Sequence, residues 1–504
     1  MRKTKIICTL GPAVESEQML RDLINEGMDV ARLNFSHGSH EEHLGRVKML
    51  KKVREEMGRP VAMLLDTRGP EIRIGQFETG MAELHPNDVF TLTTVECLGT
   101  KDKVYVNYKN LPLVVKKGDR ILIDDGLVEM VVDECTATDV ICIVMNNGII
   151  KDKKSVNVPG VKLDMPYLSE KDEQDILFAI RNDFDYIAAS FTRTAKDILD
   201  IRSFLEKNNG QDILIIAKIE NEEGVNNIDD ILEVSDGIMV ARGDMGVEIN
   251  YNELPRIQKL LIKKALHYGK ISITATQMLD SMITRPRPTR AEICDVANAI
   301  YDGTSAIMLS GETSVGCYPV ESVRTMAKIA ESTEAAIHYK KRFKQMEIAE
   351  MPLNVPNAIS RATCTTAHDL DAAAIITLTV SGITARMISR FRPMCPIIGC
   401  TTNEKVCRQL SMSWGVIPVL FEKKQSSDEL FEHAIEKAME TGVLKCGDLV
   451  VLTAGLPLGM SGTTNTLKVH TITEPAYCQG ESTGENTGNN TSKVSNVDES
   501  LLVD

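Results

Sequence analysis

Short runs of apolar residues alternate with longer amphipathic stretches through the first two-thirds of the chain. Short apolar runs bounded by turn residues are typical of buried strands, whereas apolar residues at helical spacing predict helices between them. The runs begin near Lys5, Asp29, Val61, Tyr186, Ile213, Gly237, Ile271 and Ser305. Because a helix-like stretch follows each run, directly or after an insertion, the pattern predicts a closed (β/α)8 TIM barrel, an α/β fold.

The chain between the third run and its helix has a different pattern. Residues 70–166 contain short segments, such as 89–95, 120–123 and 140–144, separated by Gly, Asn and Asp. This pattern predicts a small all-β domain inserted into the barrel. Because the insertion replaces a loop at the carboxyl end of a barrel strand, we expect it to form a lid over that end. The barrel itself is then expected to occupy residues 1–69 and 167–345.

A second α/β domain is predicted for residues 346–473. Strand-like runs occur at 373–379, 396–399, 416–420, 449–453 and 466–472, after a Pro-containing boundary at 351–356. From residue 474 to 504 the chain is rich in Gly, Asn, Ser, Thr and Glu and almost free of aromatic residues. We expect this tail to be disordered and solvated, with a binding segment as the alternative.

Composition narrows the possible classes of function. With 504 residues the chain exceeds a single core, and its net charge of -14 argues against a nucleic-acid binder while allowing a local basic pocket. The twelve cysteines form no CxxC pairs, which predicts buried thiols in a reducing cytoplasm rather than disulfides or a zinc site. No apolar segment approaches the ~18 residues of a membrane span, and the N-terminal apolar run is too short for a signal peptide.

Lys218 and Glu220 close the apolar run that begins at Ile213. Side chains alternate along a strand, so two residues that are two positions apart lie on the same side, about 7 Å apart. A cation and an anion placed in this way are either a structural ion pair that closes the core or part of a functional site. The ends of the other strands favour a site.

Polar residues close the other predicted strands as well. The second strand runs into Arg32, Asn34 and Ser36, which the alternation of a strand directs to one side. The other strand ends carry Asp66, Thr67, Arg73, Arg242, Gly243, Asp244, Thr274, Thr276, Ser310 and Glu312. Active sites of (β/α)8 barrels are assembled from the carboxyl ends of the strands, so these residues predict one polar cavity.

The residue types in this predicted cavity fit a metal ion and a phosphorylated substrate. Glu220 and Asp244 are only two carboxylates, which suits Mg2+ because that ion keeps several waters and takes further oxygens from a substrate. Arg32, Arg73 and Lys218 offer positive charge to phosphate.

The Gly243-Asp244-Met245-Gly246 turn adds a further feature. Its glycines allow the backbone to approach a ligand closely, and a helix that begins there would present free N–H groups to a carboxylate. Taken alone, such a turn is often only a turn, and a strand-terminal arginine is often a solvated charge.

Seven stretches resemble, in order and spacing, the successive signatures of the pyruvate kinase family. They are residues 5–12, 32–38, 65–75, 215–221, 241–246, 274–292 and 308–312. The match spans about residues 1–472, and the short stretch before the first strand is similar to bacterial members that lack an N-terminal extension. The resemblance implies a Mg2+- and K+-dependent cytoplasmic enzyme that transfers the phosphoryl group of phosphoenolpyruvate to ADP in the final step of glycolysis.

The resemblance also implies roles for single residues. Glu220 and Asp244 would hold Mg2+, and Lys218 would face the transferring phosphoryl group and the enolate oxygen, where a fixed cation stabilises developing charge. Arg32 and Arg73 would orient phosphates.

The remaining barrel residues would serve the substrate and a proton. Gly243, Asp244 and Thr276 would contact the substrate, with Thr276 at its carboxylate. Together with Thr276, Ser310 and Glu312 would anchor the water chain that protonates the enolate.

A monovalent-cation pocket is implied at Asn34, Ser36, Asp66 and Thr67. Glu71 agrees with the K+-dependent members, since a lysine at that position usually replaces the charge of the ion. We therefore expect activity to collapse without K+ and to be poorly restored by Na+.

Nucleotide contacts are implied for Asn34, His37, Arg73, Asp125 and Lys154. The last two lie in the inserted domain, where Ser155 replaces the glycine that usually follows the lysine. A solvated turn at Asp125 and a surface lysine at Lys154 are the alternative interpretation of that part.

The second α/β domain offers a candidate effector loop. Thr379, Ser381, Gly382 and Thr384 supply hydroxyls and N–H groups before a helix-like run, an arrangement that can hold the phosphate of an allosteric effector. The loop itself contains no lysine or arginine, so the ligand stays open, and a plain strand-to-helix turn is the alternative.

Two other functions are compatible with parts of this pattern. One is a Mg2+-dependent aldolase or lyase of 2-oxo acids, which would share the metal carboxylates but lack the K+ pocket and the β-rich lid. The other is a non-enzymatic binding protein, from which some of the site residues would be expected to be lost. The resemblance also implies a homotetramer.

Overall fold

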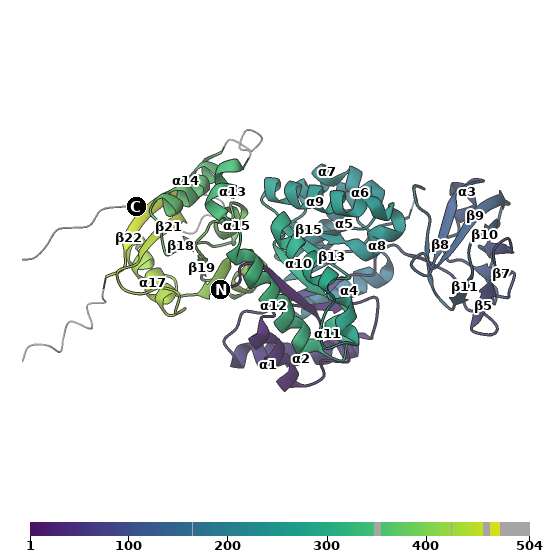
Figure 1. The fold of residues 1–504 in the computed structure, drawn as a ribbon, viewed down its shortest axis with the longest axis horizontal. Helices are drawn as coiled ribbons and strands as arrows, with labels where there is room; N and C mark the ends of the chain where they lie inside the picture. The colour runs from purple at the N-terminus through teal and green to yellow at the C-terminus, as the bar shows by residue number, and fades with distance from the viewer. Residues whose placement is uncertain (164, 347–353, 425, 457–463, 474–504) are drawn as a thin grey trace, which may run out of the picture.

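The computed structural model describes residues 1–163, 165–346, 354–424, 426–456 and 464–473. Three bodies follow one another along the longest axis of the molecule. The C-terminal α/β domain lies at one end, the barrel in the centre and the β-rich insertion at the other end (Figure 1). The predicted tail, residues 474–504, lies outside the described residues.

The predicted TIM barrel is confirmed. Its parallel strands are β1 (Lys5–Thr9), β2 (Val30–Asn34), β3 (Ala62–Asp66), β13 (Tyr186–Ala189), β14 (Leu214–Ile219), β15 (Gly237–Ala241), β16 (Ile271–Ala275) and β17 (Ala306–Leu309). They close in the order β1-β17-β16-β15-β14-β13-β3-β2, and each begins within one residue of its predicted start. Apolar residues with β-branched or long side chains, among them Ile7, Ile216 and Met308, fill the interior, as expected for a packed barrel.

Helices surround the barrel and cover the outer faces of its strands. They are α1 (Glu17–Glu26), α2 (His40–Glu56), α4 (Glu170–Arg181), α5 (Ala195–Lys207), α6 (Glu222–Asn226), α7 (Ile228–Val234), α8 (Arg242–Glu248), α9 (Leu254–Tyr268), α10 (Arg290–Asp302), α11 (Gly311–Ser314) and α12 (Pro319–Ala335). The next helix, α13 (Tyr339–Gln345), contacts the C-terminal domain instead, through Phe343 and Phe391. Leu20, Val47, Ile176 and Leu261 represent the helix faces buried in this outer core. The burial of one apolar stripe per helix is what holds the layer on the barrel.

The insertion between β3 and α4 is built of strands, as predicted. Its elements are β4 (Ile72–Arg73), β5 (Met81–Leu84), β6 (Val89–Thr93), β7 (Lys103–Tyr105), α3 (Leu111–Val114), β8 (Arg120–Ile123), β9 (Val128–Cys135), β10 (Asp139–Val144), β11 (Gly148–Lys151) and β12 (Ser155–Asn157). They form a seven-stranded sheet and a two-stranded sheet around a core of their own. The side chain of Asn157 donates a hydrogen bond to Glu248 at 2.7 Å and so ties the base of the insertion to α8.

The C-terminal domain is a five-stranded sheet with helices. Its elements are α14 (Val355–Asp369), β18 (Ala374–Leu378), α15 (Ile383–Arg390), β19 (Ile397–Thr401), α16 (Glu404–Leu410), β20 (Val416–Leu420), α17 (Ser427–Met439), β21 (Leu449–Gly455) and β22 (Thr464–Thr471). The strand order is β20-β19-β18-β21-β22, and β22 alone pairs antiparallel. All five predicted strands are present.

The C-terminal domain closes the amino end of the barrel. Met412 is fully buried and belongs to the apolar cluster inside the barrel. Arg408 pairs with Asp185 at 2.9 Å and with Asp183 at 2.6 Å, just before β13. Since a buried guanidinium group with two carboxylates is fixed in position, this pair docks the domain firmly.

The prediction that the cysteines are buried was only partly right. Cys8, Cys142, Cys364, Cys395, Cys400 and Cys407 are buried, but Cys97, Cys294, Cys317 and Cys446 are exposed. The described cysteines are all free thiols, in agreement with the absence of a CxxC pattern. Within the described residues, no helix is long and apolar enough to cross a membrane.

Candidate active site

The carboxyl ends of β2, β3 and β14 bring the predicted charged residues together. Asn34 lies opposite Asp66 in the register of β2 and β3, and Lys218 is the penultimate residue of β14. Ser36 lies in the turn that follows β2, which ends at Asn34. The alternation of a strand, which was predicted to include Ser36, therefore stops before this residue. The parallel register therefore assembles the site from residues that are far apart in the sequence.

The Lys218 ammonium is the centre of a buried network. Its Nζ lies 2.9 Å from Glu220 Oε1, 3.1 Å from Asp66 Oδ1 and 2.8 Å from the hydroxyl of Ser190. Burial alone would lower the pKa of Lys218, but the carboxylates of Asp66, Glu220 and Asp244 outweigh it and raise that pKa well above its usual value. Lys218 is therefore a permanent cation in a site from which water is largely excluded.

Arg32 is the second buried cation of the site. Its Nε lies 2.7 Å from Asp66 Oδ2, and its Nη1 donates to the hydroxyl of Thr9 at 2.8 Å. Burial would raise the pKa of Asp66, but Lys218 and Arg32 hold it below its usual range. Asp66 is thus a fixed anion between two cations.

The two carboxylate oxygens of Glu220 have different partners. The backbone N–H of Phe191 donates to Oε2, while Oε1 forms an ion pair with the Lys218 ammonium at 2.9 Å. Burial raises the pKa of Glu220, and the Lys218 ammonium opposes this rise. A buried carboxylate of this kind is a suitable ligand for a metal ion.

Asp244 is the second candidate metal ligand, and its charge acts on both Glu220 and Lys218. Within the described parts of the chain, no group of three or more His, Cys, Asp or Glu side chains forms a metal site. The available set is therefore two carboxylates, which fits Mg2+ because this ion completes its shell with water and substrate oxygens.

The predicted turn at Gly243 is the first turn of α8, which begins at Arg242. The N–H of Gly243 donates to the hydroxyl of Thr276 at 2.7 Å, and that hydroxyl donates to the carbonyl of Ala275 at 2.6 Å. Thr276 itself has a positive φ of 69°. The Arg242 guanidinium holds the carbonyl of Thr276 at 2.6 Å and pairs with Asp295 at 2.7 Å. Strained backbone held by such contacts is typical of functional sites.

Ser310 and Glu312 lie together at the end of β17. The Glu312 carboxylate accepts the N–H of Ser310 at 2.7 Å and the N–H of Leu279 at 3.0 Å. Burial raises the pKa of Glu312. The buried hydroxyl of Ser310 has no partner, so it is available to a water or a substrate.

The predicted cation pocket shares Asp66 with the Lys218 network. Asn34 Oδ1 accepts the N–H of Ser36 at 3.1 Å, and the hydroxyl of Thr67 donates to the carbonyl of Ala188 at 3.2 Å. The pocket therefore consists of neutral oxygens beside one shared carboxylate.

Of the residues predicted to contact nucleotide, Asn34 lies in the barrel site opposite Asp66, whereas His37, Arg73, Asp125 and Lys154 form other contacts. Lys154 pairs with Asp124 at 2.8 Å, and Asp125 accepts the hydroxyl of Ser155 at 3.2 Å. Arg73 pairs with Glu71 at 2.8 Å, and His37 is exposed on the loop after β2.

Three residues of the network were not predicted. Ser190, Phe191 and Thr9 follow or close β13 and β1, two strands whose ends the sequence reasoning did not inspect. The hydroxyl of Ser190 links Lys218, Asp66 and the carbonyl of Thr67. The rule that found the other strand ends would have found these residues too.

The candidate effector loop connects β18 to α15. Gly382 has the positive φ of 79° that a left-handed turn requires, and the hydroxyls of Thr384 and Thr464 lie 2.8 Å apart. Arg386, from the next turn of α15, donates to the carbonyl of Ser381 at 2.9 Å. A cation therefore reaches the loop although none lies within its sequence.

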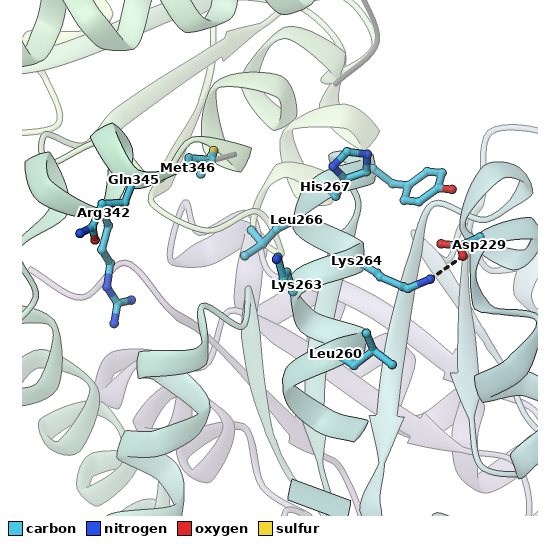
Figure 2. A pocket seen from close by; sticks show the side chains of 10 residues that line it. Asp229, Leu260, Lys263, Lys264, Leu266, His267, Arg342, Gln345 and Met346 are labelled. Carbon is cyan, nitrogen blue, oxygen red and sulfur yellow. Dashed lines mark hydrogen bonds and ion pairs between the residues drawn. The ribbon is translucent and has the colours of Figure 1, made fainter. Parts of the chain in front are cut away.

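A spacious groove of the surface lies apart from these residues. Figure 2 shows it between α9 and α13, where Leu260, His267, Arg342 and Met346 line a volume of about 720 Å³. It shares no residue with the network around Lys218. The chemistry of the strand ends, rather than the size of a groove, identifies the candidate active site.

Comparisons with known proteins agree with this geometry. A family model described as pyruvate kinase, barrel domain, matches residues 1–323, and one described as pyruvate kinase, alpha/beta domain, matches residues 357–470. The chain is 51% identical to the pyruvate kinase of Clostridium acetobutylicum over 94% of this chain and 100% of that protein.

Two further relatives point in the same direction. The pyruvate kinase of Geobacillus stearothermophilus is 52% identical, over 94% of this chain and 81% of that protein. A solved pyruvate kinase from Cryptosporidium parvum superposes with a TM-score of 0.89 at 39% identity, covering 94% of this chain and 96% of that one. The chain therefore belongs to the pyruvate kinase family.

Proposed function

We propose that this chain transfers the phosphoryl group of phosphoenolpyruvate to ADP at the carboxyl end of the barrel. The observation that carries the proposal is the buried ammonium of Lys218, held between Glu220 and Asp66. A permanent cation in a dry site is what stabilises the charge that develops on a transferring phosphoryl group and on the enolate it leaves behind.

The reaction of this family depends on metal ions, and Glu220 and Asp244 are the residues that would hold Mg2+ here. The buried carboxylate of Glu220, whose charge is near that of Asp244, supports this assignment. When bound, the ion supplies positive charge to the oxygens of the substrate.

The remaining barrel residues orient the substrate and supply a proton. Arg32 is fixed by Asp66 and Thr9, so its free N–H groups are preorganised for a phosphate. The N–H groups at the start of α8, together with Thr276, suit a carboxylate. The unpartnered hydroxyl of Ser310, beside Glu312, would hold the water that protonates the enolate.

We further assign a K+ site to Asn34, Ser36, Asp66 and Thr67. Its support is the adjacency of Asn34 and Asp66 across β2 and β3, and the presence of Glu71 rather than a lysine. On the nucleotide side, Asn34, His37, Arg73, Lys154 and Asp125 would reach ADP if the inserted domain closes over the barrel, a lid motion that would also exclude water.

The proposal also covers the domain bounds, an effector site and the assembly. The domains are assigned to residues 1–69 with 167–345, 70–166 and 346–473. Thr379, Ser381, Gly382 and Thr384 are assigned to a phosphorylated allosteric effector, with Arg386 as a further contact. A cytoplasmic homotetramer is the assembly we expect.

The decisive assay follows pyruvate release with and without ADP. With ADP present, we expect pyruvate and ATP to form in equal amounts. Without ADP, we expect neither product. An aldolase or lyase of 2-oxo acids would act without ADP. Pyruvate release that ignores ADP would therefore reject the proposed transfer.

A further inference from the structure

A narrow cavity at the amino end of the barrel gathers positive charge. It lies where the loop between α9 and β16 meets the end of α15, and Lys270, Arg386, Arg390, Arg392 and Ser413 contribute to its wall. This is the opposite end of the barrel from the candidate active site.

Four buried donor atoms around this cavity have no hydrogen-bond partner. They are Nε and Nη2 of Arg390, Nε of Arg392 and the hydroxyl of Ser413. Arg390 is only 4% exposed, and its single satisfied nitrogen, Nη1, donates to Asn357 at 3.1 Å. Buried polar groups are normally paired, so four donors without a partner at one cavity indicate a missing acceptor.

Carboxylates compensate the cavity's cations only from a distance, through Glu334 near Arg392 and Asp236 near Lys270. Among the residues that the structure describes, no carboxylate forms an ion pair with Arg386, Arg390 or Arg392. Arg392 instead donates to neutral oxygens of Ser389, Gly303 and Ser305 at 2.8 to 3.0 Å. Burial lowers the pKa of Arg392 to about 9, so it still carries its charge at neutral pH. Buried cations without a partner are strongly unfavourable.

The small volume of the cavity limits the size of the acceptor that it can hold. About 10 Å³ of the cavity admits the centre of a water molecule, which corresponds to roughly one water-sized particle. We propose that this cavity binds a small monovalent inorganic anion of halide size, held by the free donors of Arg390, Arg392 and Ser413.

The two competing occupants fit less well. A single water satisfies hydrogen bonds, but it leaves the guanidinium charges uncompensated. An oxyanion such as phosphate carries four oxygens around its central atom and exceeds the available space. The anion would fix the end of α15 against the barrel, and this inference does not depend on the proposed catalytic function.

Crystallography of the full chain with bromide tests the proposal directly. Crystals grown in potassium bromide are expected to show an anomalous peak at the bromine edge between Arg390 and Ser413. The Arg390→Met variant should lose the peak, while Arg361→Met, which removes an exposed arginine of the same domain, should keep it. A water without anomalous signal, or a carboxylate of the chain itself, in the wild-type cavity would overturn the proposal.

Thermal unfolding provides a second measurement in solution. At constant K+ concentration and ionic strength, replacing glutamate by chloride should raise the melting temperature by about 2 °C once the site is saturated. Ser413→Ala removes one donor without changing charge or bulk, so it serves if Arg390→Met fails to fold, and it should raise the half-saturating chloride concentration about fivefold. Equal melting temperatures in glutamate and chloride would contradict the proposal.

Discussion

The two ends of the barrel differ in whether their cations are paired with carboxylates. At the carboxyl end, Lys218 has two carboxylates within 3.1 Å, and Arg32 has Asp66 at 2.7 Å. At the amino end, the buried Arg390 and the half-buried Arg392 contact neutral oxygens and aromatic rings instead, with Arg392 4.8 Å from the ring of Trp414.

Arg408 shows that the amino end can also pair its cations. This arginine lies at the same end of the barrel and holds Asp185 and Asp183. The lack of a partner is therefore a property of the cavity around Arg390 rather than of that end as a whole. A site whose charges balance internally can rearrange them around a substrate, whereas an unbalanced cavity requires an ion from solution.

The Lys218→Met substitution should give the largest effect. It removes the cation that stabilises developing negative charge, and we expect kcat to fall by about 10³-fold. The measurement is the steady-state rate of ADP-dependent pyruvate release, with the fold monitored by circular dichroism.

Arg390→Met is the matched control, since it removes a buried cation at the opposite end. We expect its kcat to stay within about twofold of the wild type, because this residue lies outside the catalytic network. Near-normal transfer by the Lys218→Met variant would show the mechanism proposed here to be wrong.

Paired and unpaired arginines should differ in their contribution to stability. Arg408→Met leaves Asp185 buried without its cation, so we expect a loss of about 3 kcal/mol or more in the free energy of unfolding. Arg390→Met removes a charge that has no carboxylate partner. In chloride-free buffer we expect this variant to lose less than about 1 kcal/mol in the free energy of unfolding. Urea unfolding in potassium glutamate measures both, and equal losses would remove the distinction between the two arginines.

Much of the carboxyl end could be predicted because barrel topology converts strand ends into a site. Lys218, Glu220, Arg32 and Asp66 are each visible as a charge at the end of an apolar run. Ser190 was missed because a serine after a strand carries no distinctive signal until the end of every strand is inspected.

The amino end could not be predicted, because its cavity forms where two domains meet. Arg390 and Arg392 occur in an ordinary helix end, while Gly269 and Lys270 come from a loop more than a hundred residues earlier. Packing decides which of these donors lacks a hydrogen-bond partner. No local pattern in the sequence predicts this outcome. The missing acceptor is visible only when the contacts themselves are known.

Exchanging K+ for Na+ tests the ionic requirement of the carboxyl end alone. We expect the rate to fall roughly tenfold or more, a change of ~1.4 kcal/mol in the barrier, because Asn34 and Asp66 would hold the smaller ion less well. Glu71→Lys supplies a fixed charge in place of the ion, and this variant should become nearly independent of K+. Equal wild-type rates in Na+ and K+ buffers would refute the cation site. The chloride-dependent melting temperature should be unaffected by this exchange.

The smallest expected effect is a pH dependence at the amino end. Burial raises the pKa of Asp185 above its usual value, although Arg408 opposes the rise. A carboxyl group whose pKa is raised in the folded state stabilises the fold below its unfolded pKa and loses that contribution as pH rises through the folded pKa. In Arg408→Met the pKa of Asp185 should rise further, so protonation relieves the unpaired charge in mildly acidic solution.

The difference in melting temperature between wild type and Arg408→Met should therefore be smaller at pH 5 than at pH 7.5, by the equivalent of about 1 kcal/mol. Asp185 also accepts the N–H of Met63 at 2.8 Å, and this bond persists in the variant, which limits the rise in pKa. The double variant with Asp185→Asn is the control, because it has no charge to titrate and should show no such narrowing. A difference that stays constant between the two pH values would mean that the Arg408 pair stabilises the interface by packing rather than by charge.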